Sequence, residues 1–151
     1  MDKTNPVQHI MVLVDGTESS FRAADFAIAL ACELPAKLTA MAVVETETLH
    51  QLLHVKILSI DELAEFEKEL ENSSERQIAE VRERALRKHL VIDDAIVAGN
   101  SEELVPREVE ARQVDLIALG GFQSSRATRD LMTRQRQQIV DHVPCPVVVV
   151  K

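Results

Sequence analysis

Four short segments stand at the ends of the most apolar runs of the chain, where a binding site would be expected. They are Asp15-Gly16, Val43-Val44, Gly99-Asn100 and Gly120-Gly121. Glycines let a backbone approach a ligand closely, and amide groups at a helix N-terminus donate hydrogen bonds to anions. If the apolar runs are parallel strands, their carboxyl ends share one edge of a sheet, where ligands of such sheets bind.

Two histidines with helical spacing are candidate metal ligands. His50 and His54 are four residues apart and could share one face of a helix. No third ligand is evident, since Glu45 and Glu47 are only the nearest carboxylates. Solvated histidines are therefore the preferred interpretation, with a modest pH sensitivity of this segment as the alternative.

Four arginines crowd the last expected helix, namely Arg126, Arg129, Arg134 and Arg136. They could form an anion site near the start of that helix, helped by its dipole. The preferred interpretation is a solvated face paired with acidic neighbours such as Asp130. Ser124 and Ser125 precede these arginines, and a phosphoryl group on either serine could be held by them.

No catalytic motif is present in the sequence. The Walker-type GKS or GKT, the G-x-S-x-G elbow and HExxH are all missing. Cys145 lies between two prolines without a recognisable base, which favours a packed thiol over a nucleophile. Cys32 falls in an apolar helical pattern, so both cysteines are expected to be buried free thiols in a reducing compartment. A redox or metal enzyme would depend on Cys145 and the histidine pair alone.

Length, charge and composition restrict the class of protein further. The chain has 151 residues, a net charge of −8 and only 3% aromatic residues. This length suits one domain, residues 1–151. The negative charge would repel nucleic-acid phosphates, and no apolar run approaches the roughly 20 residues of a membrane span. The N-terminal residues lack the apolar core of a signal peptide, so we expect a cytoplasmic protein that binds neither nucleic acid nor membrane.

The apolar periodicity predicts alternating strands and helices. Strands are expected at residues 10–14, 38–44, 91–98, 115–121 and 147–150. The first helix begins at Thr17 or Ser19, a long connection spans 45–60 with a short helix near 49–54, and Asp61 caps the next helix. Asp93 and Asp94 interrupt the third strand, which suits a sheet edge. The alternation predicts an α/β fold with a mostly parallel sheet and helices on both of its faces.

Three segments of the chain resemble the universal stress protein family. They are the opening Val14-Asp15-Gly16 with its Ser/Thr-rich helix entry, the strand Asp115–Gly120, and the closing segment His142–Val150. The resemblance extends over essentially the whole chain. It implies a five-stranded sheet of order 3-2-1-4-5 and a dimer, and the apolar strand Val147–Val150 could pair across the two-fold axis.

The ATP-binding members of this family carry a signature of Gly, two residues, Gly, nine residues, Gly, and then Ser or Thr. Gly120 matches its first position, but Gln123, Thr133 and Arg134 stand at the other three. The resemblance therefore favours the universal stress protein A subgroup, which is not regarded as ATP-binding. If a nucleotide does bind, the resemblance assigns it to Asp15, Val43, Gly120 and Gly121.

The sequence thus predicts a homodimeric, non-catalytic regulatory or binding protein of the stress response, with unidentified protein partners and no cofactor. The alternative is an ATP-binding member that acts as a nucleotide-dependent switch with slow ATP hydrolysis.

Overall fold

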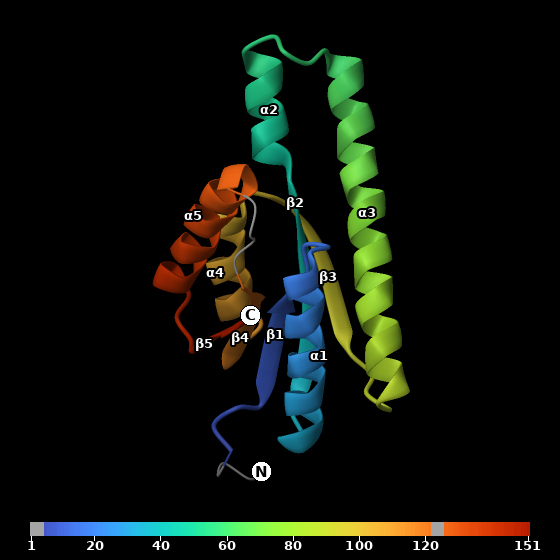
Figure 1. Ribbon diagram of the computed structural model, residues 1–151, viewed down its shortest axis with the longest axis vertical. Helices are drawn as coiled ribbons and strands as arrows, with labels where there is room; N and C mark the ends of the chain where they lie inside the picture. The colour runs from blue at the N-terminus through green and yellow to red at the C-terminus, as the bar shows by residue number, and fades with distance from the viewer. Residues whose placement is uncertain (1–4, 122–125) are drawn as a thin grey trace.

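Five parallel strands form the middle layer of the protein (Figure 1). The computed structural model describes residues 5–121 and 126–151, except for the side chains of 48 and 126–133. The strand order is β3-β2-β1-β4-β5, as the family resemblance implied. The elements in chain order are β1 (His9–Leu13), α1 (Glu18–Glu33), β2 (Lys37–Glu45), α2 (Thr46–His54), α3 (Ile60–Arg87), β3 (Asp93–Gly99), α4 (Ser101–Ala111), β4 (Leu116–Gly120), α5 (Arg126–His142) and β5 (Val147–Val150).

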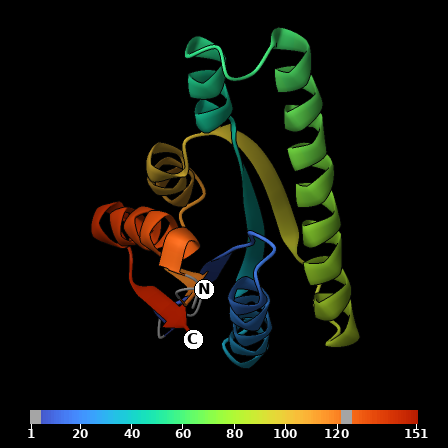
Figure 2. The ribbon, with the colours of Figure 1, turned by 45° about the horizontal axis from the view of Figure 1, so that its top comes forward.

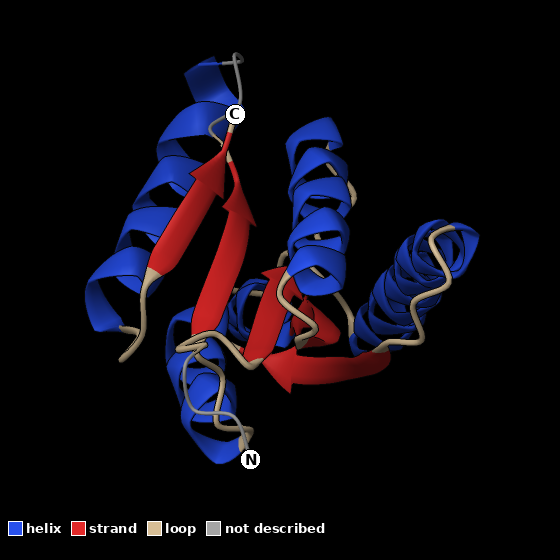
Figure 3. Cartoon of the chain, turned by 90° about the horizontal axis from the view of Figure 1, so that it is seen from below, coloured by secondary structure: helices blue, strands red, loops and turns tan. Residues whose placement is uncertain are grey.

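Helices cover both faces of the sheet, so its central strands are buried on both sides (Figure 3). α1 and α3 pack on one face against Ile10, Val12 and Leu38. α4 and α5 pack on the other face against Met11, Met41 and Ile117. Because both faces are covered, the inner strands read as continuous apolar runs in the sequence.

Helix α1 approaches the sheet closely because its buried side chains are small. Its inner face consists largely of alanines, with Ala23, Ala24, Ala27 and Ala31 at most 1% exposed. Thr17 caps the helix by accepting a hydrogen bond from the N–H of Ser20. The sequence offered Thr17 and Ser19 as alternative caps of this helix, and the structure shows that the cap is Thr17.

The third strand lies at an edge of the sheet, as predicted. Among the described strands β3 pairs only with β2, and its two aspartates are exposed and take part in ion pairs. Asp93 pairs with Lys37, and Asp94 pairs with Arg82. Carboxylates are tolerated in this strand because an edge leaves them at the surface.

The connection after β2 is more regular than the sequence indicated. α2 occupies Thr46–His54 and is longer than the short helix expected near 49–54. The cap of α3 is Ser59 and not Asp61, because Ser59 and Glu62 form a reciprocal capping box. Asp61 lies in the first turn of the helix instead. α2 and the first turns of α3 form an antiparallel hairpin that projects beyond the sheet (Figures 1 and 2).

The cysteine prediction is wrong for Cys32, which is exposed, whereas Cys145 is half-buried. Consecutive residues of a helix are rotated by about 100°, so Cys32 points away from the sheet although Ala31 before it is buried. Among the described residues, no helix combines the length and apolarity needed to cross a bilayer.

Candidate functional site

A cavity of about 270 Å³ lies at the carboxyl ends of β1, β2 and β4, between α3 and α5. Its apolar wall includes Leu13, Met41, Val43, Leu119 and Ile139. Its polar wall includes Asp15, Glu45 and Arg136. This is the edge of the sheet at which the sequence predicted a binding site.

Asp15 follows β1 directly and is held by the start of α1. Its carboxylate accepts hydrogen bonds from the N–H of Thr17 at 3.0 Å and from the Thr17 hydroxyl at 2.6 Å. Arg136 on α5 donates to the same carboxylate at 2.9 Å. Burial opposes ionisation, but these hydrogen bonds outweigh it and lower the pKa of Asp15 below its ordinary value. Asp15 is therefore an anion near neutral pH.

Arg136 closes one side of the cavity. Its side chain is only 8% exposed, and besides Asp15 it donates to the backbone carbonyl of Gly121. The prediction of a solvated arginine face is therefore wrong for this residue. Arg136 lies one turn before the buried Ile139 on α5, so its side chain is directed at the sheet, where the Asp15 carboxylate and a carbonyl receive it.

The two glycines after β4 have different roles in packing. A Cβ on Gly120 would lie 2.6 Å from the backbone of Ser19 and Ser20, so α1 can pack at this distance only against glycine. Gly121 lies against Lys151 and presents its carbonyl to Arg136 and to the Ser19 hydroxyl, which donates at 3.0 Å.

Glu45 is a cavity residue that the sequence did not identify as part of this site. It ends β2, and one of its oxygens accepts hydrogen bonds from the hydroxyl and N–H of Ser101 and from the Gln135 amide at 2.8 Å. Glu45 thereby links the end of β2 to the first residue of α4 and to the middle of α5. The sequence signal was its position immediately after the apolar Val43-Val44.

The structure brings three of the four predicted nucleotide-site residues to the cavity. Asp15, Val43 and Gly120 line it, and Gly121 adjoins it through the carbonyl bound by Arg136. Asn100 instead caps α4, where its side-chain oxygen accepts a hydrogen bond from the N–H of Glu102.

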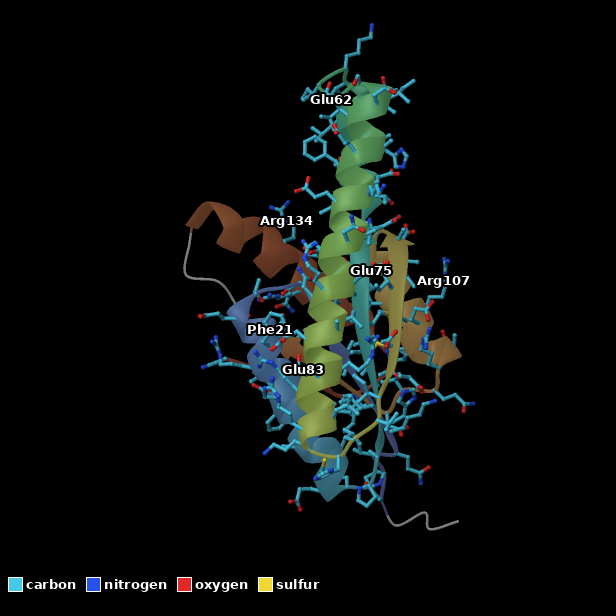
Figure 4. All side chains as sticks on the ribbon, turned by 90° about the vertical axis from the view of Figure 1, so that its right-hand side faces the viewer. Phe21, Glu62, Glu75, Glu83, Arg107 and Arg134 are labelled. Atoms are coloured by element: carbon cyan, nitrogen blue, oxygen red, sulfur yellow. The ribbon has the colours of Figure 1, made fainter. Side chains whose placement is uncertain are left out.

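The signature positions lie only partly within the described residues. Gln123 lies outside them, as do the candidate phosphorylation sites Ser124 and Ser125, and so do the side chains of Arg126, Arg129 and Thr133. Arg134 is exposed on α5 (Figure 4) and borders a second hollow of about 200 Å³ with Glu45, Glu47 and Asn100.

The histidine pair lies on α2, away from the cavity. His50 and His54 are exposed, and His50 approaches Glu67 at 3.4 Å. Within the part of the chain that the structure describes, no three metal-binding side chains are grouped. Solvated histidines were the preferred interpretation, and their exposure agrees with it.

The charge of the cavity wall determines what the site can accept. Among the described lining residues, two carboxylates, Asp15 and Glu45, face the single guanidinium of Arg136. The described part of the wall therefore carries a net negative charge, and the guanidinium within it is already paired. Such a surface suits an apolar or uncharged group and opposes a polyphosphate.

Comparison with known proteins places this geometry in context. The profile of the universal stress protein family matches residues 6–151. No curated protein matches the chain.

Three solved structures of universal stress proteins are similar to the chain. UspA of Lactobacillus plantarum is 22% identical, with a TM-score of 0.77 and coverage of 95% of this chain and 97% of that one. A family protein of Burkholderia pseudomallei is 17% identical, with a TM-score of 0.75 and coverage of 96% of each chain. A family protein of Arabidopsis thaliana with AMP bound is 14% identical, with a TM-score of 0.66 and coverage of 95% and 91%. At these identities the structures establish the shared fold.

Proposed function

The chain belongs to the universal stress protein family, and from this premise we propose that it is a non-catalytic regulatory protein that binds partner proteins in the cytoplasm without using ATP. One observation carries the proposal: Arg136 is buried against Asp15 and the Gly121 carbonyl. Asp15 and Gly121 are two of the residues that the family resemblance assigns to a nucleotide.

Nucleotide binding would have to compete with this internal contact. A ligand that used the Asp15 carboxylate would displace Arg136, leaving a guanidinium without its counter-ion in a buried position. Glu45 adds a second negative charge to the wall, which opposes phosphates. The altered signature at Gln123, Thr133 and Arg134 points in the same direction.

Calorimetric titration of the nucleotide-free protein with ATP and magnesium tests the proposal directly. We expect no saturable heat at ligand concentrations up to about 1 mM, an affinity weaker than roughly −4 kcal/mol. Saturable micromolar binding by the unmodified protein would refute it.

The same calorimetric titration, carried out with adenosine on two arginine variants, tests whether Arg136 closes the site. Arg136→Ala frees Asp15 and should raise the affinity for adenosine, a ligand without phosphates. Arg134→Ala removes an exposed arginine two residues earlier on the same helix and should leave adenosine binding unchanged. Equal behaviour of the two variants would show that Arg136 does not close the site.

A second candidate function, a nucleotide-dependent switch, is favoured by a different observation. Asp15, Val43 and Gly120 line one cavity at the carboxyl edge of the sheet. A structure of the Arabidopsis relative was determined with AMP bound. If ATP binds, slow hydrolysis in a sensitive phosphate-release assay would support this switch over the ATP-independent protein.

We also propose that the protein is a homodimer that pairs through β5. This strand lies at a sheet edge, pairs only with β4 among the described strands, and consists of four valines, of which Val149 is 43% exposed. An unpaired apolar edge strand is suited to pairing with a second copy. Sedimentation that finds only monomer at micromolar concentration would contradict the dimer.

A further inference from the structure

The helical hairpin after β2 exposes a group of large apolar side chains, here called the hairpin tip. Its members and their exposed fractions are Val55 (61%), Ile57 (66%), Ile60 (74%), Phe66 (45%) and Leu70 (38%). They make up five of the ten exposed large apolar residues of the described chain, although they fall within sixteen consecutive positions. Single exposed apolar residues are ordinary, but a cluster of this kind marks an interaction site.

The hairpin tip leaves much of its apolar surface open to solvent. By contrast, Leu49 of α2 and Leu63 of α3, in the same hairpin, are both less than a tenth exposed. Ile60, Phe66 and Leu70 lie within an arc of about 120° on α3 and extend over about 15 Å of its axis. They flank the buried Leu63 in the same arc, and together they leave an exposed apolar stripe long enough to receive a helix of a partner.

Acidic residues surround this stripe. Residues 55–71 contain six carboxylates and two lysines, a net −4, so about half of the net charge of −8 lies in this short segment. Of the six carboxylates, only Glu67 has an ion-pairing partner among the described residues, His50. Figure 4 shows Glu62 at the projecting end of α3, far from Glu83 at the end that packs on the sheet.

We propose that the hairpin tip is a docking site for a basic amphipathic helix of a partner protein. The stripe would receive the apolar face of that helix, and its Lys and Arg residues would pair with the surrounding carboxylates. This inference rests on the proposed regulatory function, because it names the kind of partner through which the protein acts.

The acidic charge around the hairpin tip favours a basic helix over a second copy of the chain or an anionic lipid surface. A second copy would bring an equally acidic hairpin against the first, and anionic lipid headgroups would be repelled in the same way. The tip also projects from the end of β2, whereas the expected dimer strand β5 lies at the far edge of the sheet. Docking at the tip therefore leaves β5 free to pair.

Fluorescence anisotropy of the full-length protein with two labelled peptides tests the proposal. The probe is an amphipathic helical peptide of about 18 residues built from leucine and lysine. Its matched control carries glutamate in place of every lysine. We expect micromolar binding of the lysine peptide, weakened as NaCl rises from about 50 to about 500 mM, and no binding of the glutamate peptide.

Two pairs of variants locate the binding. Ile57→Ser combined with Ile60→Ser should weaken binding of the lysine peptide about tenfold. Val91→Ser removes an 84% exposed valine elsewhere and should have no effect. Glu69→Lys should weaken binding severalfold and reduce its salt dependence, whereas Glu110→Lys on the exposed side of α4 should not. All five positions are exposed, so the fold should be retained.

Several outcomes would overturn the proposal. Equal binding of both peptides, or lysine-peptide binding unchanged in the double serine variant, would show that the tip is not the site. Loss of sedimentation-detected dimer in that variant would assign the tip to a second copy, and binding of anionic vesicles through it would assign it to a membrane. None of these results alters the ATP titration, so failure here is distinguishable from failure of the proposed function.

Discussion

The two ends of the sheet both bury charged or titratable groups, but they do so in different ways. At the carboxyl end, Asp15, Glu45 and Arg136 surround a cavity of about 270 Å³. At the amino end, His9 is 8% exposed and both of its ring nitrogens are engaged. Its Nδ1 lies 2.9 Å from the carbonyl of Arg112, and its Nε2 lies 2.8 Å from the Thr39 hydroxyl.

The amino end is closed by hydrogen bonds that fit one protonation state. The Arg112 carbonyl can only accept, so Nδ1 of His9 carries a proton, and in the neutral ring, which burial favours, Nε2 accepts from the Thr39 hydroxyl. Asp115 accepts from the N–H groups of Gln8 and His9 at 2.8 and 2.9 Å, joining β1 to the start of β4. Polar groups that are satisfied by their neighbours, as at the amino end, stabilise the fold, whereas charged groups around a hollow can exchange an internal partner for a ligand.

The largest effect is expected for Gly120→Ala at the carboxyl end. The added methyl would lie 2.6 Å from the backbone of Ser19 and Ser20, so α1 would have to move away from β4. We expect a loss of about 3 kcal/mol in the free energy of unfolding, measured by urea denaturation. In the matched variant Gly121→Ala, the added methyl would lie 3.0 Å from the backbone of Lys151 and 3.2 Å from the Val150 carbonyl. These contacts are less severe than those at Gly120, so the loss should be below about 1 kcal/mol. Equal losses would show that α1 is not fixed against Gly120.

An intermediate effect is expected for Asp15→Asn, which leaves Arg136 without a counter-ion. Arg136 is 8% exposed and Asp15 38% exposed, so the loss should be about 2 kcal/mol, below that of a fully buried pair. The control Asp94→Asn breaks the more exposed pair with Arg82 and should cost less than about 0.5 kcal/mol.

The Asp15 pair also gives a pH dependence with a definite sign. The folded-state pKa of Asp15 is lowered, so its contribution is present above the ordinary value of 3.8 and is lost as the pH falls through the folded-state pKa. Acid denaturation should therefore be shallower in Asp15→Asn than in the unmodified protein. Identical acid profiles would count against the ion pair.

A smaller effect is expected at the amino end, where burial lowers the pKa of His9, opposed only in part by the Arg112 carbonyl. The unfolded chain then binds a proton more readily, so stability is complete above the ordinary pKa of 6.5 and declines as the pH falls below it. His9→Gln should cost about 1 kcal/mol at neutral pH and remove this decline. A decline that persists in the variant would have to come from another group.

The last prediction concerns the reactivity of the two thiols and involves no change in stability. Burial raises the pKa of Cys145, which is half-buried, whereas Cys32 is exposed on α1. Cys32 should therefore react with iodoacetamide about tenfold faster, as followed by mass spectrometry of tryptic peptides. Comparable rates would mean that the turn before β5 opens readily.

Much of the fold could be predicted from the sequence because its signals are local. Apolar runs such as 10–14 and 115–119 indicate strands buried on both faces, and their alternation with helical periodicity requires parallel connections. The aspartates of β3 indicated an edge strand for the same kind of reason. The strand order needed the family resemblance, because periodicity does not record which strands are neighbours.

The site could be predicted only in outline. Strand ends located Asp15, Val43 and Gly120 at one edge of the sheet, since parallel strands place their carboxyl ends together. The buried role of Arg136 was missed because arginine on a polar helix is usually solvated, and no local pattern records a partner that lies 121 residues away. Glu45 was missed because its three donors come from α4 and α5.

The sequence by itself determined the elements, their parallel arrangement and the edge of the sheet where a site would form, because these follow from periodicity and turn chemistry within short segments. Only the tertiary structure decided that Arg136 pairs with Asp15, that Gly120 must accommodate α1, and that the hairpin tip stays uncovered. These features depend on which distant side chains meet at contact distance, and that is set by how the helices pack on the sheet.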